Sequence, residues 1–313
     1  MSQTQASSGT LKRIKFRFRP AELRRLSGYL FLAPAVIFIV LTMLYPLLYN
    51  LYLSLHDVTV GNFVAGTAPF VGFEKYGEII ADPTFRHSLL ISLLFTAGSL
   101  VFQFTIGFAL ALFFNRSFPG SGTMRAFMLL GWMLPIVVSG NIWRWMLEGD
   151  NGVVNFVLQG LGLLQTSPFW LTEPGTALIG TIIANIWIGI PFNMVLLLAG
   201  LQGISGTLYE AGDIDGTTAW QRFLYITWPM MRPVSLIVLL LGFIYTFKVF
   251  DLIFVMTGGG PVAATTTLPL YVYDLTFEFF RFGDGAAAAT LLLLMSLGVS
   301  VFYLWLSRHE EAA

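Results

Sequence analysis

The chain has 313 residues, of which 56% are hydrophobic and only 11% charged, and its mean hydropathy is +0.75. So few charged groups cannot solvate a globular surface of this size, so the composition predicts a membrane protein. The chain contains no cysteine, which excludes disulfides, thiolate metal sites and a cysteine nucleophile. The formal net charge is zero, but seven Lys and Arg residues precede the first apolar segment. We interpret this excess as an orientation signal rather than a nucleic-acid site.

Apolar segments recur along the chain, and six of them are long enough to cross a bilayer. The first, at about 28–52, follows a basic tail at 1–27 and exceeds the apolar core of a typical signal peptide. We therefore expect an uncleaved anchor, with a cleaved signal peptide as the competing interpretation. The other spans are expected at about 88–114, 127–147, 176–201, 234–256 and 286–306, followed by a tail at 307–313. The sequence thus predicts an all-α, polytopic membrane protein whose transmembrane domain covers 28–306.

Few strongly polar side chains interrupt these spans, and each needs a partner in apolar surroundings. Gln103 is the only strongly polar residue in the interior of the second span. Arg144 lies near the end of the third span, where we expect its guanidinium to reach the membrane interface; a buried functional charge is the alternative. Lys248 and Asp251 are three residues apart in the fifth span, and we expect them to neutralise each other.

The connections between spans also carry signals. Residues 56–85 are rich in Gly, Pro and acidic side chains, which predicts an exposed segment with a short helix near Glu74–Ile80. Residues 148–175 form a Gly-rich, acidic loop that has no Lys or Arg. Three glycines and a proline in the run Thr257–Pro261 are expected to end the fifth span sharply.

The distribution of basic residues predicts the orientation of the chain. With the N-terminus inside and six spans, 12 Lys and Arg residues lie on the inner side and only 3 on the outer side. Loops rich in Lys and Arg stay in the cytoplasm. The bias therefore places both termini, and the polar loop between the fourth and fifth spans, in the cytoplasm.

That polar loop, at 203–232, is the most informative part of the chain. Apolar residues recur in it at helical spacing, first at Leu208, Ala211 and Ile214 and then at Trp220, Phe223 and Leu224. This periodicity predicts two short amphipathic helices. Gly216 lies between them and supplies the left-handed backbone that ends the first helix. Pro229 and Pro233 are expected to end the second helix before the next span begins.

The loop resembles a motif of one transporter family. The membrane permeases of binding-protein-dependent ABC importers carry a cytoplasmic loop of pattern E-A-A-x-x-x-G-(nine residues)-I-x-L-P. The matching positions here are Glu210, Ala211, Gly216, Ile226 and Pro229. Two positions depart, because Gly212 replaces the second alanine and Trp228 replaces the leucine. The surrounding residues resemble the carbohydrate branch of the family. The alternative to the family motif is a charged loop that merely joins two membrane helices.

The resemblance implies a permease of the type I importer fold, in which this loop is a coupling hairpin that inserts into a separate ATPase subunit. The coupling residues that it implies are Glu210, Ala211, Asp213, Ile214, Asp215, Gly216, Trp220, Phe223, Ile226 and Pro229. It further implies a second homologous permease, two ATPase subunits and an extracytoplasmic solute-binding protein. A long pattern around Phe250–Asp251 and Thr257–Pro261 is similar to the first permease of the pair in sugar systems.

The chain offers no catalytic machinery of its own. None of the four lysines stands in G-x-x-x-x-G-K-[ST], so the phosphate-binding loop of an ATPase is absent from the sequence. The three histidines have no metal-ligand spacing, and no Ser, His and Asp arrangement suggests hydrolysis. We therefore expect no enzyme activity, no bound cofactor and no metal in this chain, with ATP and Mg²⁺ bound by the partner ATPase subunits.

Spans four and five supply groups suited to a sugar. Asn185, Gly189 and Asn193 share one face of span four, while Tyr245 and Val249 share one face of span five with Thr246 alongside. In maltose-type permeases the sugar contacts lie at fixed numbers of residues from the glutamate of the E-A-A motif. Counted from Glu210, the same spacings fall on Gly189, Phe192, Gly242, Tyr245, Thr246 and Val249. The predicted substrate pathway is therefore Asn185, Gly189, Phe192, Asn193, Gly242, Tyr245, Thr246 and Val249. The alternative is that these polar residues satisfy one another between packed helices.

The sequence is thus similar to an inner-membrane permease of a bacterium that imports a carbohydrate or polyol. We expect it to lie in the lipid bilayer and to bind no nucleic acid. A gradient-driven secondary transporter is one rival, favoured weakly by the intramembrane Lys248 and Asp251. A membrane assembly subunit that transports nothing is the other.

Overall fold

The computed structural model describes residues 31–311, so the whole predicted basic tail at 1–27, the first three residues of the predicted first span and the last two residues of the chain lie outside the described residues. The chain divides into two compact units, 1–50 and 51–313. Between residues 31 and 311 the regular structure is helical, and the only strand-like feature is an isolated antiparallel bridge between His56 and Phe70.

The first unit is helical throughout its described part. The continuous helix Phe31–Ser54 extends into the second unit and is long and apolar enough to span a membrane. It includes a π-helical stretch, η1 (Val40–Leu44), followed by α2 (Tyr45–Ser54). Apolar side chains are exposed along it, including Phe31 and Met43. A helix satisfies its own backbone hydrogen bonds, so such a surface is stable against lipid.

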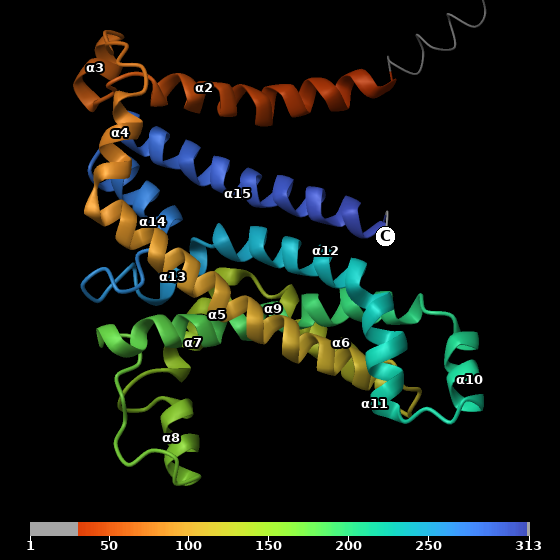
Figure 1. Ribbon diagram of the computed structural model, residues 1–313. Coiled ribbons are helices and arrows are strands. Elements are labelled where there is room, and N and C mark those ends of the chain that lie inside the picture. The colour runs from red at the N-terminus through yellow and green to blue at the C-terminus, as the bar shows by residue number, and fades with distance from the viewer. Residues whose placement is uncertain (1–30, 312–313) are drawn as a thin grey trace, which may run out of the picture. The chain divides into compact units, whose positions relative to one another are not determined.

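The second unit is built on four long apolar helices, which Figure 1 shows running roughly along one another. They are α5 (Pro83–Phe114), α9 (Pro174–Gln202), the continuous helix Ala219–Phe247 and α15 (Phe282–Glu311). With Phe31–Ser54, five helices are long and apolar enough to cross a membrane, among the residues described. A pair of shorter helices, bent relative to each other, raises the number of candidate spans among these residues to six if the pair counts as one span.

The bent pair corrects the predicted third span at 127–147. The chain forms α6 (Ser121–Met133) and α7 (Ile136–Met146), whose axes differ by 96°. Pro135 has no amide hydrogen and holds Leu134 in an extended conformation with ψ 139°. The segment predicted as the third span is therefore two helices at a sharp angle, because proline in this position breaks the hydrogen-bond ladder, and its crossing of the membrane stays a prediction.

The fifth span differs from its predicted bounds at both ends. It joins α11 (Ala219–Arg222), the π-helical η2 (Phe223–Thr227) and α12 (Trp228–Phe247) without interruption. Pro229 and Pro233 do not end the second hairpin helix, contrary to prediction. Pro229 stands in the first turn of α12, directly after the wider π turn, and a widened turn relieves the clash of a proline ring with the preceding carbonyl.

The span also ends earlier than the predicted residue 256. Lys248 has a non-helical backbone and caps α12, and a new helix, α13 (Asp251–Met256), follows it. Lys248 and Asp251 therefore do not share a helix face, and they form no ion pair in the described structure. The expected neutralisation was wrong, because i and i+3 neighbours meet only when the helix is continuous. The Lys248 ammonium instead lies 5.4 Å from the centre of the Tyr245 ring.

Short helices fill the connections. The expected helix near Glu74–Ile80 is present as α4 (Glu74–Ala81), whereas α8 (Val153–Gly160) forms inside the segment that was predicted to be a loop. The others are α3 (Val60–Ala65), α10 (Gly206–Ile214), α14 (Leu268–Tyr273) and η3 (Asp274–Glu278). Figure 1 shows α10 and α11 at one end of the long helices of this unit, and α4 and α14 near the opposite end.

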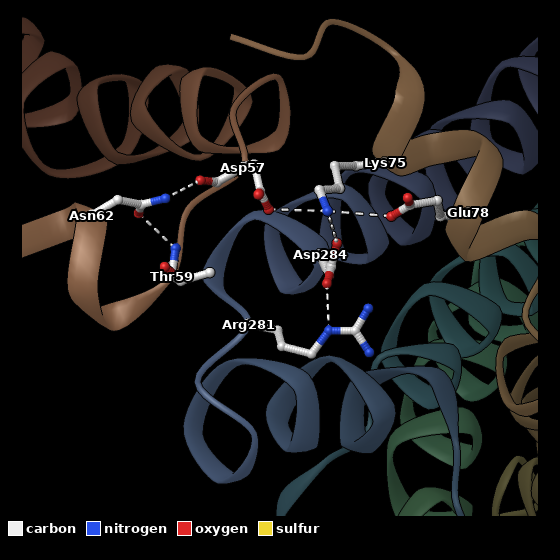
Figure 2. Close-up of polar contacts among 7 residues, drawn as sticks. All are labelled: Asp57, Thr59, Asn62, Lys75, Glu78, Arg281 and Asp284. Atoms are coloured by element: carbon white, nitrogen blue, oxygen red, sulfur yellow. Dashed lines mark hydrogen bonds and ion pairs between the residues drawn. The ribbon is translucent and has the colours of Figure 1, made fainter. Parts of the chain in front are cut away.

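At that opposite end an ion network joins α4 to the start of α15. Figure 2 shows the Lys75 ammonium among three carboxylates, 3.0 Å from Asp57, 3.2 Å from Glu78 and 3.4 Å from Asp284. Arg281 donates to the second oxygen of Asp284, whose side chain is only 6% exposed. Burial of the ammonium lowers the pKa of Lys75, but the hydrogen bond to Asp57 and the other carboxylates outweigh it. The pKa of Lys75 therefore lies above its ordinary value.

We predict that Lys75→Met lowers the free energy of unfolding by about 2 kcal/mol, because it leaves the buried carboxylate of Asp284 with one partner fewer. The measurement is the thermal unfolding midpoint of the purified protein in detergent. Glu78→Gln is the matched control, since its half-exposed side chain contributes less than about 1 kcal/mol. Equal midpoints for the two variants would contradict a stabilising role for the network.

Candidate functional site

A cavity of about 330 Å³ lies among the long helices of the second unit. It is bordered by α5, α6, α7, α9, α12 and α13, and by the break that separates α12 from α13. All eight residues of the predicted substrate pathway line it, together with Gln103, Trp132, Ile136, Ile188 and Leu252. The structure therefore brings the eight together around one cavity, and their contact with a solute stays a prediction.

Aromatic rings form one side of the cavity. Phe192 of α9 and Tyr245 of α12 meet edge to face, with ring centres 5.7 Å apart. Trp132 of α6 lies 5.8 Å from Phe192 on a tilted plane. Tyr245 is 55% exposed although its ring contacts Phe192 and the Lys248 ammonium, so part of this side chain is accessible. Such rings offer flat apolar faces together with a polar group.

Amide side chains form another side of the cavity. Asn193 of α9 is 1% exposed and donates from Nδ2 to the carbonyl of Gly189 at 2.9 Å, while its Oδ1 has no hydrogen-bond partner. Asn185 is 5% exposed, and its Nδ2 has no partner. Gln103 of α5 is 3% exposed and donates from Nε2 to the carbonyl of Asn185 at 2.8 Å. These amides are hydrogen-bonded only in part.

Gln103 was not among the predicted pathway residues. Its signal was present in the sequence, because it is the only strongly polar side chain in the interior of its span. Trp132 and Ile136 were also missed, since they reach the cavity only because α6 and α7 bend at Pro135. No charged side chain is found in the cavity lining, within the part of the chain that the structure describes.

The polar hairpin at 203–232 turns at Gly216, as predicted. Gly216 has φ +71°, and its amide donates to the carbonyl of Asp213, while the amide of Thr217 donates to the carbonyl of Gly212. These two bonds close the end of α10 in the Schellman arrangement, which requires the left-handed backbone that glycine adopts without strain. Thr218 and Gln221 then form a capping box that starts α11.

Gly212 replaces the second alanine of the family pattern, and the structure gives a physical reason. It is the buried residue of α10, and a Cβ built at this position would lie 3.0 Å from Thr217 Oγ1 and 3.2 Å from Ile226 Cδ1. Both distances are tight for a Cβ atom. The two halves of the hairpin approach each other more closely than an alanine there allows without adjustment.

The residues predicted to couple to a partner do not all face outward. Ile214 is 88% exposed and Trp220 is 67% exposed, so both present large apolar surfaces to a potential partner. Phe223 instead is half-buried, stacks on Trp220 and packs edge to face on Phe108 of α5, and its coupling role stays a prediction. Five of the remaining predicted residues are exposed, namely Glu210, Ala211, Asp213, Asp215 and Gly216. The other two, Ile226 and Pro229, are half-buried.

One of the hairpin carboxylates already has a partner within the chain. Asp213 accepts a hydrogen bond from Arg222, which joins the end of α10 to α11. Glu210 and Asp215 are exposed and form no ion pair in the described structure. The hairpin thus presents two apolar side chains and two free carboxylates on a rigid turn.

Arg144 lies in the last turn of α7, near the end of the segment as predicted. Its side chain is exposed, and its guanidinium lies 3.5 Å from the carbonyl of Val255 in α13. It lines a separate hollow with Glu148 and Asp150. The arginine is therefore not buried among the long helices.

Known relatives match this chain over nearly its full length. A trehalose/maltose transport system permease protein, MalF, of Thermococcus litoralis is 35% identical over 95% of this chain and 97% of its own length. A sulfoquinovosyl glycerol transport system permease protein, SmoG, of Agrobacterium fabrum is 35% identical over 92% of each chain. A lactose transport system permease protein, LacF, of Rhizobium radiobacter is 33% identical over 91% of this chain and 95% of its own length.

The fold also matches a solved structure. A chain of a bacterial ABC transporter that imports the acidic polysaccharide alginate superposes with a TM-score of 0.78, with 92% of this chain and 96% of that chain covered at 24% identity. Residues 103–310 match the family described as the inner membrane component of binding-protein-dependent transport systems. This range contains all the residues that line the cavity and the whole polar hairpin. The chain therefore belongs to the family of binding-protein-dependent transport system inner membrane components.

Proposed function

We propose that this permease imports a carbohydrate, such as a sugar, oligosaccharide or polyol, in an ATP-driven complex. The observation that carries the proposal is the cavity, which combines ring faces from Phe192 and Tyr245 with the partly hydrogen-bonded amides of Asn185 and Asn193. Sugars have apolar ring faces and many hydroxyls, so both kinds of group suit them. The printed names of three relatives, which refer to trehalose and maltose, sulfoquinovosyl glycerol and lactose, support the same class.

The energy for import is proposed to come from separate subunits. The hairpin offers exposed Ile214 and Trp220 as apolar anchors and Glu210 as a charged rim, which is the pattern of a protein interface. We assign its partner as an ATPase subunit that binds ATP and Mg²⁺, one below this chain and one below a second homologous permease. An extracytoplasmic solute-binding protein delivers the carbohydrate at the opposite end. In this assignment the chain binds no cofactor and hydrolyses nothing itself.

The defining experiment is reconstitution. The chain is co-expressed with its candidate second permease, ATPase subunits and binding protein, purified as one complex, and placed in proteoliposomes. ATP-dependent uptake of a radiolabelled sugar supports the proposal. Uptake by the isolated chain, driven by an ion gradient without ATPase subunits, would instead support a secondary transporter. Stable membrane assembly with no uptake under either condition would favour an assembly subunit.

The hairpin prediction concerns Gly216→Val. A β-branched residue at φ +71° costs about 1 kcal/mol or more, so the turn shifts and the two short helices no longer align with the ATPase. We expect uptake to collapse while membrane insertion stays normal. Gly206→Val is the matched control, because an added Cβ there meets no atom within 4 Å and the backbone is not left-handed. Normal uptake with normal ATPase association in Gly216→Val would remove the hairpin from the coupling role.

The cavity prediction concerns Tyr245→Ala. Loss of the ring and hydroxyl is expected to weaken the interaction with solute by roughly 1 to 3 kcal/mol, and so to raise the solute concentration at half-maximal transport. Asn193→Ala is a second polar test, and Tyr45→Ala is the control on an exposed helix face. Thermal stability of each purified complex is measured in parallel. Reduced stability with an unchanged solute dependence would show that Tyr245 only packs between helices.

The orientation prediction follows from the distribution of basic residues. Reporters fused after Arg116 and after Arg308 should report the cytoplasm, and reporters near Gly66, Gly160 and Asp274 should report the outside. In this orientation the chain lies in the inner membrane, and both termini and the hairpin are in the cytoplasm. A cytoplasmic signal at Gly160 would show that the bent pair α6 and α7 does not cross the membrane as one span.

A further inference from the structure

A second hollow, of about 600 Å³, lies where α7 ends, and its lining residues differ from those of the central cavity. Figure 1 shows α7 and α8 at the end of the second unit that is away from α10 and α11. In the orientation that the basic residues predict, this end faces the outside of the cell. The lining residues of this Arg144 hollow include Arg144, Trp145, Glu148, Asp150, Phe169 and Thr172.

Charged groups of both signs line the Arg144 hollow without pairing. Arg144, Glu148 and Asp150 are exposed and form no ion pair in the part of the chain that the structure describes. The guanidinium of Arg144 lies 3.5 Å from the carbonyl of Val255, which leaves most of its N–H groups available. The guanidinium only donates hydrogen bonds, and ionised carboxylates only accept them. A solute with several hydroxyls can satisfy both, whereas an anionic lipid headgroup would meet two like charges.

Two aromatic side chains of the same lining are largely uncovered by the rest of the chain. Trp145 is 74% exposed and Phe169 is 44% exposed. Rings beside hydrogen-bonding groups suit a sugar, which has an apolar ring face as well as hydroxyls. A tryptophan and an arginine at the end of a span are also typical of a membrane interface. That explanation accounts for Trp145 and Arg144 taken alone, but not for the wall that faces them.

The rest of the wall is held together by one buried amide. Asn155 of α8 is 2% exposed, and its Nδ2 donates to the carbonyls of Gly149 at 2.9 Å and Pro168 at 3.1 Å. Its Oδ1 accepts from Trp170 Nε1 at 2.7 Å. A Cβ built on Gly149 would lie 2.3 to 2.8 Å from ring atoms of Phe169, so the backbone passes directly against that ring. The wall is therefore preformed, which lowers the entropy that binding a solute would cost.

The Arg144 hollow and the central cavity occupy successive positions along α13. Leu252 lines the cavity, and Met256, one turn further along the helix, lines the hollow. Leu147 also lines the hollow, and all three side chains belong to one buried apolar cluster. Packed side chains thus separate the two openings, which are neighbouring but distinct.

We propose that the Arg144 hollow is a second carbohydrate site, which binds the solute at the end opposite the hairpin before the solute enters the central cavity. The guanidinium of Arg144 donates to sugar hydroxyls, the carboxylates of Glu148 and Asp150 accept from them, and the ring of Trp145 packs against the sugar ring. This inference rests on the proposed function, because it takes the solute to be a carbohydrate.

The absence of cysteine from the chain allows a test at a single position. Thr172→Cys places a thiol of similar size in the lining of the Arg144 hollow, and its rate of labelling by a maleimide is measured in the assembled importer in nanodiscs, without binding protein. Trehalose, maltose, lactose and sulfoquinovosyl glycerol are the probes. At least one of them should slow the labelling. Gly160→Cys is the matched control, because it lies in α8 outside the lining and an added Cβ there meets no atom within 4 Å.

Further variants in the Thr172→Cys background identify the binding groups. Trp145→Ala and Glu148→Ala should each raise the half-protecting sugar concentration about tenfold, the effect of one lost ring contact or one lost hydrogen bond to a charged group. Their matched controls are Trp305→Ala on α15 and Glu173→Ala in the same acidic loop, both exposed and outside the lining. Tyr245→Ala alters the central cavity and should leave the half-protecting concentration unchanged. An unaltered labelling rate without sugar shows that each variant keeps the hollow intact.

Three outcomes would overturn the inference. If no probe slows the labelling of Thr172→Cys, or if Gly160→Cys is slowed equally, the hollow binds no sugar. Protection by the solute-binding protein alone, with none by sugar, would assign the hollow to protein docking instead. Loss of protection in Tyr245→Ala would place the bound sugar in the central cavity. ATP-dependent uptake is measured with the same complexes, so that uptake without protection refutes only this inference, whereas no uptake of any probe refutes the proposed function.

Discussion

The close contact between α5 and α9 is the constraint on which the rest of the second unit depends. Apolar helices in a bilayer gain little from burying apolar surface against each other, so their association rests on tight packing and on polar contacts between them. Gly107 and Gly189 supply the tight packing, and the bond from Gln103 to the carbonyl of Asn185 supplies the polar contact. The cavity opens where these contacts place amides beside the ring of Phe192, so packing and function share one set of residues.

The sequence predicted the helical class, most of the spans and the hairpin turn because these features follow from local rules. A run of apolar residues predicts a span, and Gly216 between two periodic segments predicts a left-handed turn. Seven of the eight pathway residues converge because α9 and α12 each present one face, and Val249 joins them from the break that follows α12. Their distances from Glu210, taken from the family resemblance, gave six of the eight, and the helical spacing on span four added Asn185 and Asn193. Sequence therefore located most of the cavity wall before any contact between helices was visible.

The errors come from positions where a helix changes its local geometry. Pro135 breaks a span that hydropathy treats as continuous, whereas Pro229 and Pro233 are accommodated in a helix that they were expected to end. Hydropathy does not distinguish these cases, because the outcome depends on whether the helix widens before the proline. Gln103 was missed for another reason, since it makes its decisive contact with a residue far away in the sequence.

One continuous helix joins the second half of the hairpin to the cavity wall. Trp220, exposed in the hairpin, and Tyr245, in the cavity wall, both lie in Ala219–Phe247, about 37 Å apart along the helix path, and Figure 1 shows this path turning between α11 and α12. No loop interrupts this path, although the π-helical turn before Pro229 makes one point of reduced regularity. The helix ends at Phe247, so the cavity wall passes from α12 through Val249 to Leu252 of α13. One helix therefore contributes both to the hairpin surface and to the cavity wall, while the remaining part of that wall comes from separate helices.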